Sequence, residues 1–167
     1  KQPRKPSGFR AEGEMRITYV ARSFLDYRVP VLQELDRLCA GNLHYITSDR
    51  LTPERAITRL RSILGDRLIV LSGERSVGTD RPDGANTSFC VPYQPGLLRA
   101  IAETRPDVLI GDGFFQWSFG AFLQRILRGT PLVICYERWS HVERNAQWYR
   151  KLYRQAVLKF TDAISCN

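Results

Sequence analysis

One short stretch of the chain, CYERWSHVERN (residues 135–145), combines side chains that can transfer protons with side chains that can bind anions. A neutral histidine such as His141 can take a proton from a hydroxyl group, because its ordinary pKa lies near neutral pH. Arg138 and Arg144 can each pair with a carboxylate or a phosphate. The stretch is therefore either a polar site at the end of a strand or a charged turn that leads into a helix.

The ionisable residues of this stretch also have simpler structural roles. A carboxylate directly after a buried strand has to be paired or to face a polar cleft. Glu137 would meet that requirement through an ion pair with Arg138 or Arg144. His141 would then be an exposed residue in the first turn of the following helix. The choice depends on where the fold places the stretch.

The rest of the chain alternates between strand and helix patterns. Short apolar segments rich in β-branched residues predict strands at residues 16–21, 42–48, 67–72, 107–113, 131–137 and 163–167. Helical spacing of apolar residues covers 30–40, 52–66, 95–105, 114–129 and 141–162 between them. This alternation requires crossovers, which make the strands parallel and cover both sheet faces with helices. We predict an α/β fold, doubly wound around a mainly parallel sheet.

Two segments carry more local predictions. Thr52 is expected to cap the helix that follows, with Pro53 at its first position and Gly65 at its end. Residues 73–96 are rich in turn-forming residues and are predicted to form a long loop, with one brief strand candidate at residues 87–91.

Polar and aromatic residues gather where the predicted strands end, whereas the opposite loops are short. The candidates are Arg22, Ser23, Tyr27 and Arg28 after the first strand, Ser48, Asp49 and Arg50 after the second, Asp112, Gly113, Phe114 and Trp117 after the fourth, and Glu137, Arg138, Trp139 and His141 after the fifth. Ligands of open parallel sheets bind beyond the carboxyl ends of the strands, so we predict a binding site at this edge. Asp112 would either accept hydrogen bonds from sugar hydroxyls or cap the next helix.

The composition fits one domain in a reducing compartment. The chain has 167 residues, of which 43% are hydrophobic, and this is enough for one core. Its four cysteines form no CxxC pair, and there are only two histidines. The sequence therefore offers too few clustered Cys and His ligands for a structural zinc site. No apolar run is long enough to cross a bilayer. We expect a cytoplasmic protein with no metal, in which residues 15–167 form the single domain.

The charge balance suggests an anionic partner or none. The chain has 25 basic and 17 acidic residues, which gives a net charge of +8. Residues 1–14 are basic and rich in proline and glycine, and we expect a disordered arm there. A nucleic-acid partner is not expected, because the sequence contains no recognisable recognition helix, stacking sheet or zinc module.

The last helical segment leaves one further partner open. Apolar residues at helical spacing predict a face packed in the core; they are Val142, Ala146, Tyr149, Leu152, Tyr153, Ala156, Val157 and Phe160. Arginines and lysines flank this stripe. A helix that lies on an anionic membrane has a similar pattern, so contact with the inner face of a membrane is an open alternative.

Taken in order, several segments resemble the amino-terminal half of the GT-B glycosyltransferases of family 4, which are retaining and use sugar nucleotides. The resemblance spans nearly all of residues 15–167 and rests on MRITYVARSF, YRVPVLQEL, RPDVLIGDGFF, PLVICYERWSHVERN and YRKLYRQAVLKFTDAISCN. The resemblance lies in the order of these segments along the chain. One departure is the first loop, where many relatives have glycines and this chain has ARSFLDYRVP.

The resemblance implies a Rossmann-like domain that holds the acceptor, while a second, carboxyl-terminal domain binds the nucleotide sugar. It implies no cofactor bound by this domain, and it implies a sugar or lipid-linked acceptor in glycan, polysaccharide or glycolipid synthesis. Glu137 and His141 resemble the loop that faces the reacting sugar and are the expected catalytic residues. The expected acceptor-binding residues are Arg22, Ser23, Tyr27, Arg28, Asp112, Gly113, Phe114, Trp117, Arg138 and Arg144.

Two other readings keep the same fold. In one, the chain is a stand-alone, non-catalytic module that binds an anionic ligand or a protein. In the other, it is a related α/β enzyme complete in one domain. A following segment with its own strand and helix rhythm and two glutamates near a helix start would favour the transferase.

Overall fold

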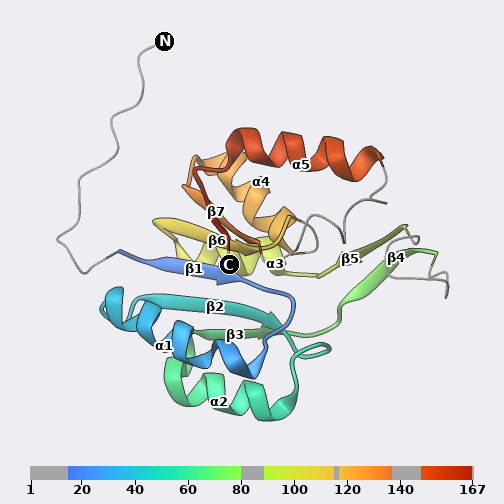
Figure 1. Cartoon of the computed structure of the whole chain (residues 1–167). Helices are drawn as coiled ribbons and strands as arrows, with labels where there is room; N and C mark the ends of the chain where they lie inside the picture. The colour runs from blue at the N-terminus through green and yellow to red at the C-terminus, as the bar shows by residue number, and fades with distance from the viewer. Residues whose placement is uncertain (1–14, 80–88, 115–116, 137–147, 167) are drawn as a thin grey trace.

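A six-stranded parallel sheet runs through the centre of the molecule (Figure 1). The computed structural model describes residues 15–79, 89–114, 117–136 and 148–166, so the predicted arm at residues 1–14 lies outside the described residues. The strands are β1 (Ile17–Val20), β2 (Leu43–Ser48), β3 (Leu68–Leu71), β6 (Val108–Asp112), β7 (Leu132–Tyr136) and β8 (Ala163–Cys166). Each predicted strand is present within one or two residues of its expected bounds. The α/β fold class and the doubly wound parallel sheet are confirmed.

The order of the strands reverses in the middle of the sheet. Neighbouring strands follow the order β3-β2-β1-β6-β7-β8, and all five pairs are parallel. The chain therefore moves outward from β1 in one direction, returns to pair β6 with β1, and moves outward in the other direction. Loops at the carboxyl ends of β1 and β6 diverge at this point, which is where open α/β sheets bind their ligands.

Helices cover the two faces of the sheet in separate groups (Figure 1). One face carries α1 (Val29–Leu38), preceded by the short helix η1 (Asp26–Arg28), and α2 (Glu54–Leu64), followed by η2 (Gly65–Arg67). The other carries α3 (Leu97–Thr104), α4 (Ser118–Arg128) and α5 (Trp148–Phe160). Two apolar clusters fill the two layers, with Leu60 of α2 in one and Ile101 of α3 in the other, both fully buried. Such burial on both faces explains why the strands are continuous apolar runs.

The start of α2 differs from the prediction. Pro53 precedes the first helical residue, Glu54, and no side chain caps this end of the helix. The hydroxyl of Thr52 is buried and forms a 2.7 Å hydrogen bond with the hydroxyl of Thr47 in β2. Thr52 therefore ties the loop to the sheet instead of capping the helix, while Gly65 ends the helix at a positive φ of 58°, as predicted.

The predicted long loop at residues 73–96 contains a second small sheet. Strands β4 (Arg75–Thr79) and β5 (Phe89–Tyr93) pair in antiparallel fashion, with Val77 opposite Val91. Only β5 overlaps the strand candidate of the sequence. Figure 1 shows this hairpin reaching past the carboxyl ends of the parallel strands.

Helix α5 buries less of its apolar stripe than predicted. Val157 is buried and Tyr153 is half-buried, but Leu152, Ala156 and Phe160 are exposed. The prediction of a single core face along this stripe is therefore wrong for these three residues. None of the helices formed by the described residues is both long and apolar enough to span a lipid bilayer.

Candidate functional site

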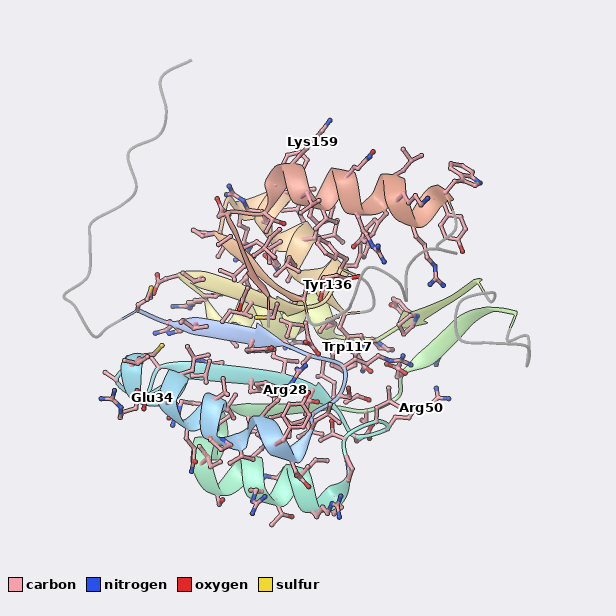
Figure 2. The ribbon with its side chains drawn as sticks, in the orientation of Figure 1. Arg28, Glu34, Arg50, Trp117, Tyr136 and Lys159 are labelled. Carbon is pink, nitrogen blue, oxygen red and sulfur yellow. The ribbon has the colours of Figure 1, made fainter. Side chains whose placement is uncertain are left out.

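Loops that follow four different strands bring a set of polar residues to the carboxyl edge of the sheet. We call this set the edge cluster; it consists of Arg22, Arg28, Arg50, Glu74, Asp112 and Trp117. Arg22 and Arg28 follow β1, Arg50 follows β2, Glu74 follows β3, and Asp112 ends β6. Figure 2 shows Arg28, Trp117 and Arg50 around the ends of these strands. Five of the six were sequence candidates.

Arg28 and Asp112 join the two halves of the sheet at the point where the strand order reverses. An Nη1 hydrogen atom of Arg28 is donated to Oδ1 of Asp112 across 3.1 Å, although the two residues are 84 positions apart. Both side chains are only partly exposed. The carbonyl oxygen of Asp112 accepts a 3.1 Å hydrogen bond from the hydroxyl of Ser118, at the start of α4. The carboxylate of Asp112 thus bonds the segment after β1, and its main-chain carbonyl bonds the start of α4. No side chain caps this end of α4.

Glu74 is the centre of the other half of the edge cluster. Its carboxylate accepts two 2.7 Å hydrogen bonds from Nε and Nη2 of Arg22 and one of 3.0 Å from the indole of Trp117. Arg50 adds an ion pair at 3.8 Å. The Glu74 side chain is fully covered, whereas that of Arg50 is 54% exposed. One buried carboxylate therefore fixes the loops after β1 and β3 to the start of α4.

The electrostatics of Glu74 follow from these contacts. Burial alone would raise its pKa, because it removes water from the charged form. The hydrogen bonds and positive charge of Arg22, with the Trp117 indole and Arg50, outweigh burial and lower the pKa of Glu74 below its ordinary value. Glu74 therefore stays ionised near neutral pH and holds the two arginines in place.

The sequence reasoning missed Glu74, although a usable signal was present. It lies three residues after the end of β3, much as Ser23 lies three residues after the end of β1 and Arg50 lies two residues after the end of β2. Because residues 73–96 looked like one long loop, the rule for strand ends was not applied to the third strand.

Aromatic residues form the wall of the edge on the side of α4 and α5. The ring of Phe114 packs edge-on against that of Tyr136, the last residue of β7, with 4.9 Å between centroids. The guanidinium of Arg154 lies about 6 Å from both rings. Phe114 and Trp117 are buried, so the structure places these two candidates in the core beneath the edge. Their predicted contact with an acceptor stays a prediction.

Ser48 is fully buried at the end of β2 and Asp49 is exposed directly after it, whereas three further candidates, Gly113, Ser23 and Tyr27, lie at or near the surface. Gly113 has a φ of +77°, which strains any residue with a side chain, and its N–H donates a 2.7 Å bond to the carbonyl of Cys135. Ser23 is partly exposed in the loop after β1. Tyr27 is exposed, and its ring lies 5.9 Å from the Arg28 guanidinium.

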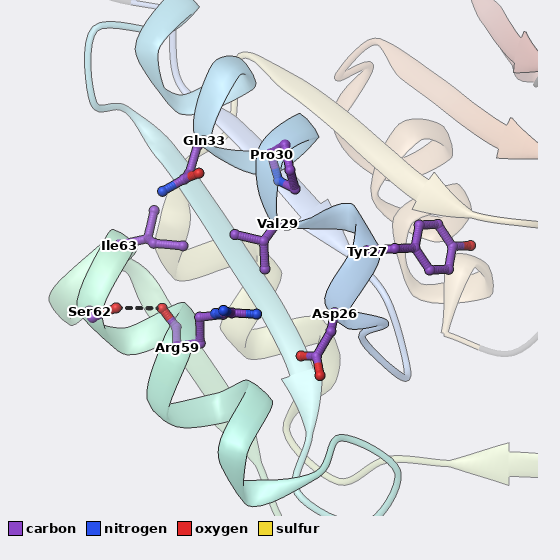
Figure 3. Close-up of a pocket in the computed structure, with 8 residues that line it drawn as sticks. All are labelled: Asp26, Tyr27, Val29, Pro30, Gln33, Arg59, Ser62 and Ile63. Atoms are coloured by element: carbon purple, nitrogen blue, oxygen red, sulfur yellow. Dashed lines mark hydrogen bonds between the residues drawn. The ribbon is translucent and has the colours of Figure 1, made fainter.

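Tyr27 also borders a cleft of about 450 Å³ between η1, α1 and α2. Figure 3 shows the Tyr27 ring pointing away from this cleft, while Arg59 reaches into it below Val29 and to one side of Asp26. Its lining comes from helices on one sheet face and contains no residue of the edge cluster. The cleft is therefore separate from the candidate site.

The other candidates, Glu137, Arg138, Trp139, His141 and Arg144, lie outside the described residues. Strand β7 ends at Tyr136, so the chain enters this stretch from the edge that carries the cluster. Among the residues that the structure does describe, no group of three His, Cys, Asp or Glu side chains is placed to hold a metal ion. Comparisons with models of protein families, with curated proteins and with solved structures found no match to this chain.

Proposed function

We propose that this chain is the acceptor-binding amino-terminal half of a retaining glycosyltransferase that uses a sugar nucleotide. The product would be a glycan, a polysaccharide or a glycolipid. The observation that carries the proposal is the Arg28–Asp112 pair, which lies where the strand order of the sheet reverses. The order of segments that resembles family 4 supports the same conclusion, since it implies a domain of this fold class.

The chemistry of the edge cluster suits a ligand with many hydroxyl groups. A hydroxyl both donates and accepts hydrogen bonds, so it can bond a guanidinium and a carboxylate that stand side by side. Three arginines and two carboxylates leave one net positive charge in the cluster. Arg22 and Arg28 already pair with Glu74 and Asp112, and a strongly anionic ligand would have to compete with these carboxylates.

The proposed reaction moves a sugar from a nucleotide to the bound acceptor. The acceptor hydroxyl oxygen forms a bond to the anomeric carbon on the face from which the diphosphate oxygen departs, so that the bond to that oxygen breaks, the nucleoside diphosphate leaves and the configuration is retained. The hydroxyl proton leaves to a base, for which we propose His141 with Glu137 as its orienting partner. Arg138 and Arg144 would contact anionic groups of the substrates. The nucleotide sugar itself would be held by a second domain beyond Asn167.

The test is sugar transfer by the product of the complete coding sequence. The protein is incubated with a panel of nucleotide sugars and acceptors, and release of nucleoside diphosphate is measured. The variants Glu137→Gln and His141→Asn should lower transfer at least about 100-fold, the usual contribution of a general base, while their melting temperatures stay unchanged. The exposed pair Arg99–Glu103 offers a matched control in Glu103→Gln. Unchanged turnover in both site variants would remove them from the mechanism.

A second function has one observation in its favour. Arg50 is half exposed and meets Glu74 only at 3.8 Å, so its charge is available to an anion. A stand-alone, non-catalytic module that binds an anionic ligand or a protein would use it. Such a module would bind inorganic phosphate through Arg50 and would show no sugar transfer with any donor. A coding sequence that stops directly after Asn167 would favour this reading.

A further inference from the structure

The layer formed by α4 and α5 is strongly basic. These two helices contain six of the 25 basic residues of the chain and none of its 17 acidic residues; they are Arg125, Arg128, Arg150, Lys151, Arg154 and Lys159. Arg125 bonds Asp162, and Arg154 faces the rings of the edge. Lys151 and Lys159 do not hold other parts of the domain in this way, because both lie on the exposed side of α5.

An apolar line runs along the same exposed side of α5. Trp148, Leu152 and Ala156 follow one another at intervals of four residues, which places them on one side of a helix. Trp148 is 72% exposed and Leu152 is 56% exposed. We call the surface formed by Trp148, Lys151, Leu152, Ala156 and Lys159 the α5 face. Figure 2 shows Lys159 pointing away from the sheet.

The α5 face is not needed to hold the helix on the domain. The opposite side of α5 packs on α4 through Val157, which is buried, and through the ring of Tyr153, which lies 6.2 Å from Phe119 and 6.3 Å from Phe122. Large apolar side chains that do not serve packing and stand together with lysines are unusual on a free surface, and they mark contact sites.

The exposed apolar surface continues at the far end of α4. Leu127 is 74% exposed, and Ile126 and Phe160 are each about half exposed. Arg125 links this end to α5 by donating to the carbonyl of Phe160 across 3.1 Å. The basic and apolar residues therefore extend over one layer of the molecule instead of one isolated turn.

We propose that the α5 face docks on the surface of an anionic lipid bilayer. Trp148 and Leu152 can enter the region between headgroups and acyl chains, while the two lysines reach the headgroup phosphates. A nucleic acid would find cations and the single ring of Trp148 here, but Leu152 and Ala156 offer no further rings on which successive bases can stack. A second copy of the same face would bring lysines against lysines. An anionic bilayer satisfies both the charge and the apolar line.

Docking of this kind places the start of α5, which lies on the side of the carboxyl edge, next to the membrane. Helix α5 connects the carboxyl end of β7 to the start of β8, so it runs antiparallel to the strands, and its first residue, Trp148, lies on the side of the carboxyl edge. The inference rests on α4 and α5 and does not depend on the proposed sugar transfer. Membrane binding without transfer, or transfer without membrane binding, would separate the two.

The test is flotation of the full chain with lipid vesicles. Vesicles of phosphatidylcholine mixed with phosphatidylglycerol should carry the protein to the top of a gradient, and vesicles of phosphatidylcholine alone should carry far less. The double variant Lys151→Gln/Lys159→Gln should weaken partition to the anionic vesicles about 25-fold, from about fivefold for each lysine. Trp148→Ala should weaken it about tenfold, and the melting temperature of this variant should stay unchanged, which would show that it is folded.

The matched control removes the same charge from the opposite layer. Arg59 and Arg61 are exposed on α2, and Arg59→Gln/Arg61→Gln should leave partition within about threefold of the unaltered chain. An equal loss in this control would overturn the proposal, because net charge alone would then drive binding. It would also be overturned by no flotation with anionic vesicles at low salt, by dimerisation that Trp148→Ala abolishes, or by an oligonucleotide that binds more tightly than the vesicles.

Discussion

Removing the carboxylate of Glu74 should destabilise the domain more than removing any exposed carboxylate. In Glu74→Ala, Arg22 loses both of its 2.7 Å hydrogen bonds and the indole of Trp117 loses its acceptor. The Arg22 side chain is only 18% exposed, so water can replace the lost partner only in part. The free energy of unfolding should therefore report the loss directly.

The expected magnitude follows from the burial of the pair. Deleting one partner of a buried ion pair costs about 3–5 kcal/mol, since the other charge is left without compensation. A buried donor left without an acceptor, here the Trp117 indole, costs about 1–3 kcal/mol, and the two losses do not add fully. We expect a decrease of about 3–5 kcal/mol for Glu74→Ala and about 1–3 kcal/mol for Glu74→Gln, which keeps one acceptor oxygen.

Urea unfolding followed by circular dichroism measures this decrease by linear extrapolation. The control is Glu103→Ala, because Glu103 also pairs with an arginine at 2.7 Å but both side chains are mainly exposed. Exposed pairs contribute about 0–1 kcal/mol, so this variant should barely move the urea midpoint.

A double variant tests whether the cost comes from the unpaired arginine. Arg22→Met/Glu74→Leu replaces both charges with apolar side chains and should recover part of the stability lost in Glu74→Ala. The reasoning is refuted if Glu74→Ala lowers the free energy of unfolding no more than Glu103→Ala does. It is also refuted if the double variant loses more free energy of unfolding than its two single variants lose together.

Two other predictions concern the same edge. In Gly111→Ala the new methyl group would lie 3.0 Å from Oγ of Ser118 and 3.1 Å from Cδ1 of Ile134. We expect the free energy of unfolding, measured in urea, to fall by about 1–3 kcal/mol because of this overpacking. An unchanged urea midpoint would show that α4 can shift at no cost. The lowered pKa of Glu74 means that its ionised form stabilises the folded state. This stability is fully present above the ordinary carboxyl pKa of about 4.3 and is lost as pH falls through the lowered value. The acid-induced fall in melting temperature should therefore be smaller in Glu74→Gln than in the unaltered chain.

The sheet could be predicted because its strands are buried on both faces. Segments such as LHYITS in β2, of which five of the six residues are buried, have no other stable place in a chain of this length. The hairpin could not be predicted as a whole, because β4 reads RSVGT and has no apolar run that marks a strand. Antiparallel pairing with β5 forms it.

The exposure of α5 was missed for a geometric reason. Leu152 and Val157 both fit a loose helical stripe, but they are five residues apart and so stand roughly 140° apart around a helix with 3.6 residues per turn. Only one of them can face α4. The position of Glu74 shortly after β3 is visible in the sequence, but its role is not, since that role depends on Arg22, which is 52 positions away, and spacing within one segment cannot show such a contact.

The most direct test of the account is the acceptor dependence of the complete protein when Asp112 is changed to Asn. The substitution removes the charge that faces Arg28 and leaves the size of the side chain almost unchanged. Loss of a charged hydrogen-bond acceptor should raise the KM for the sugar acceptor about tenfold or more, while the KM for the nucleotide sugar stays the same. An unchanged KM for the acceptor, or an increase confined to the nucleotide sugar, would contradict an acceptor site between the ends of β1 and β6.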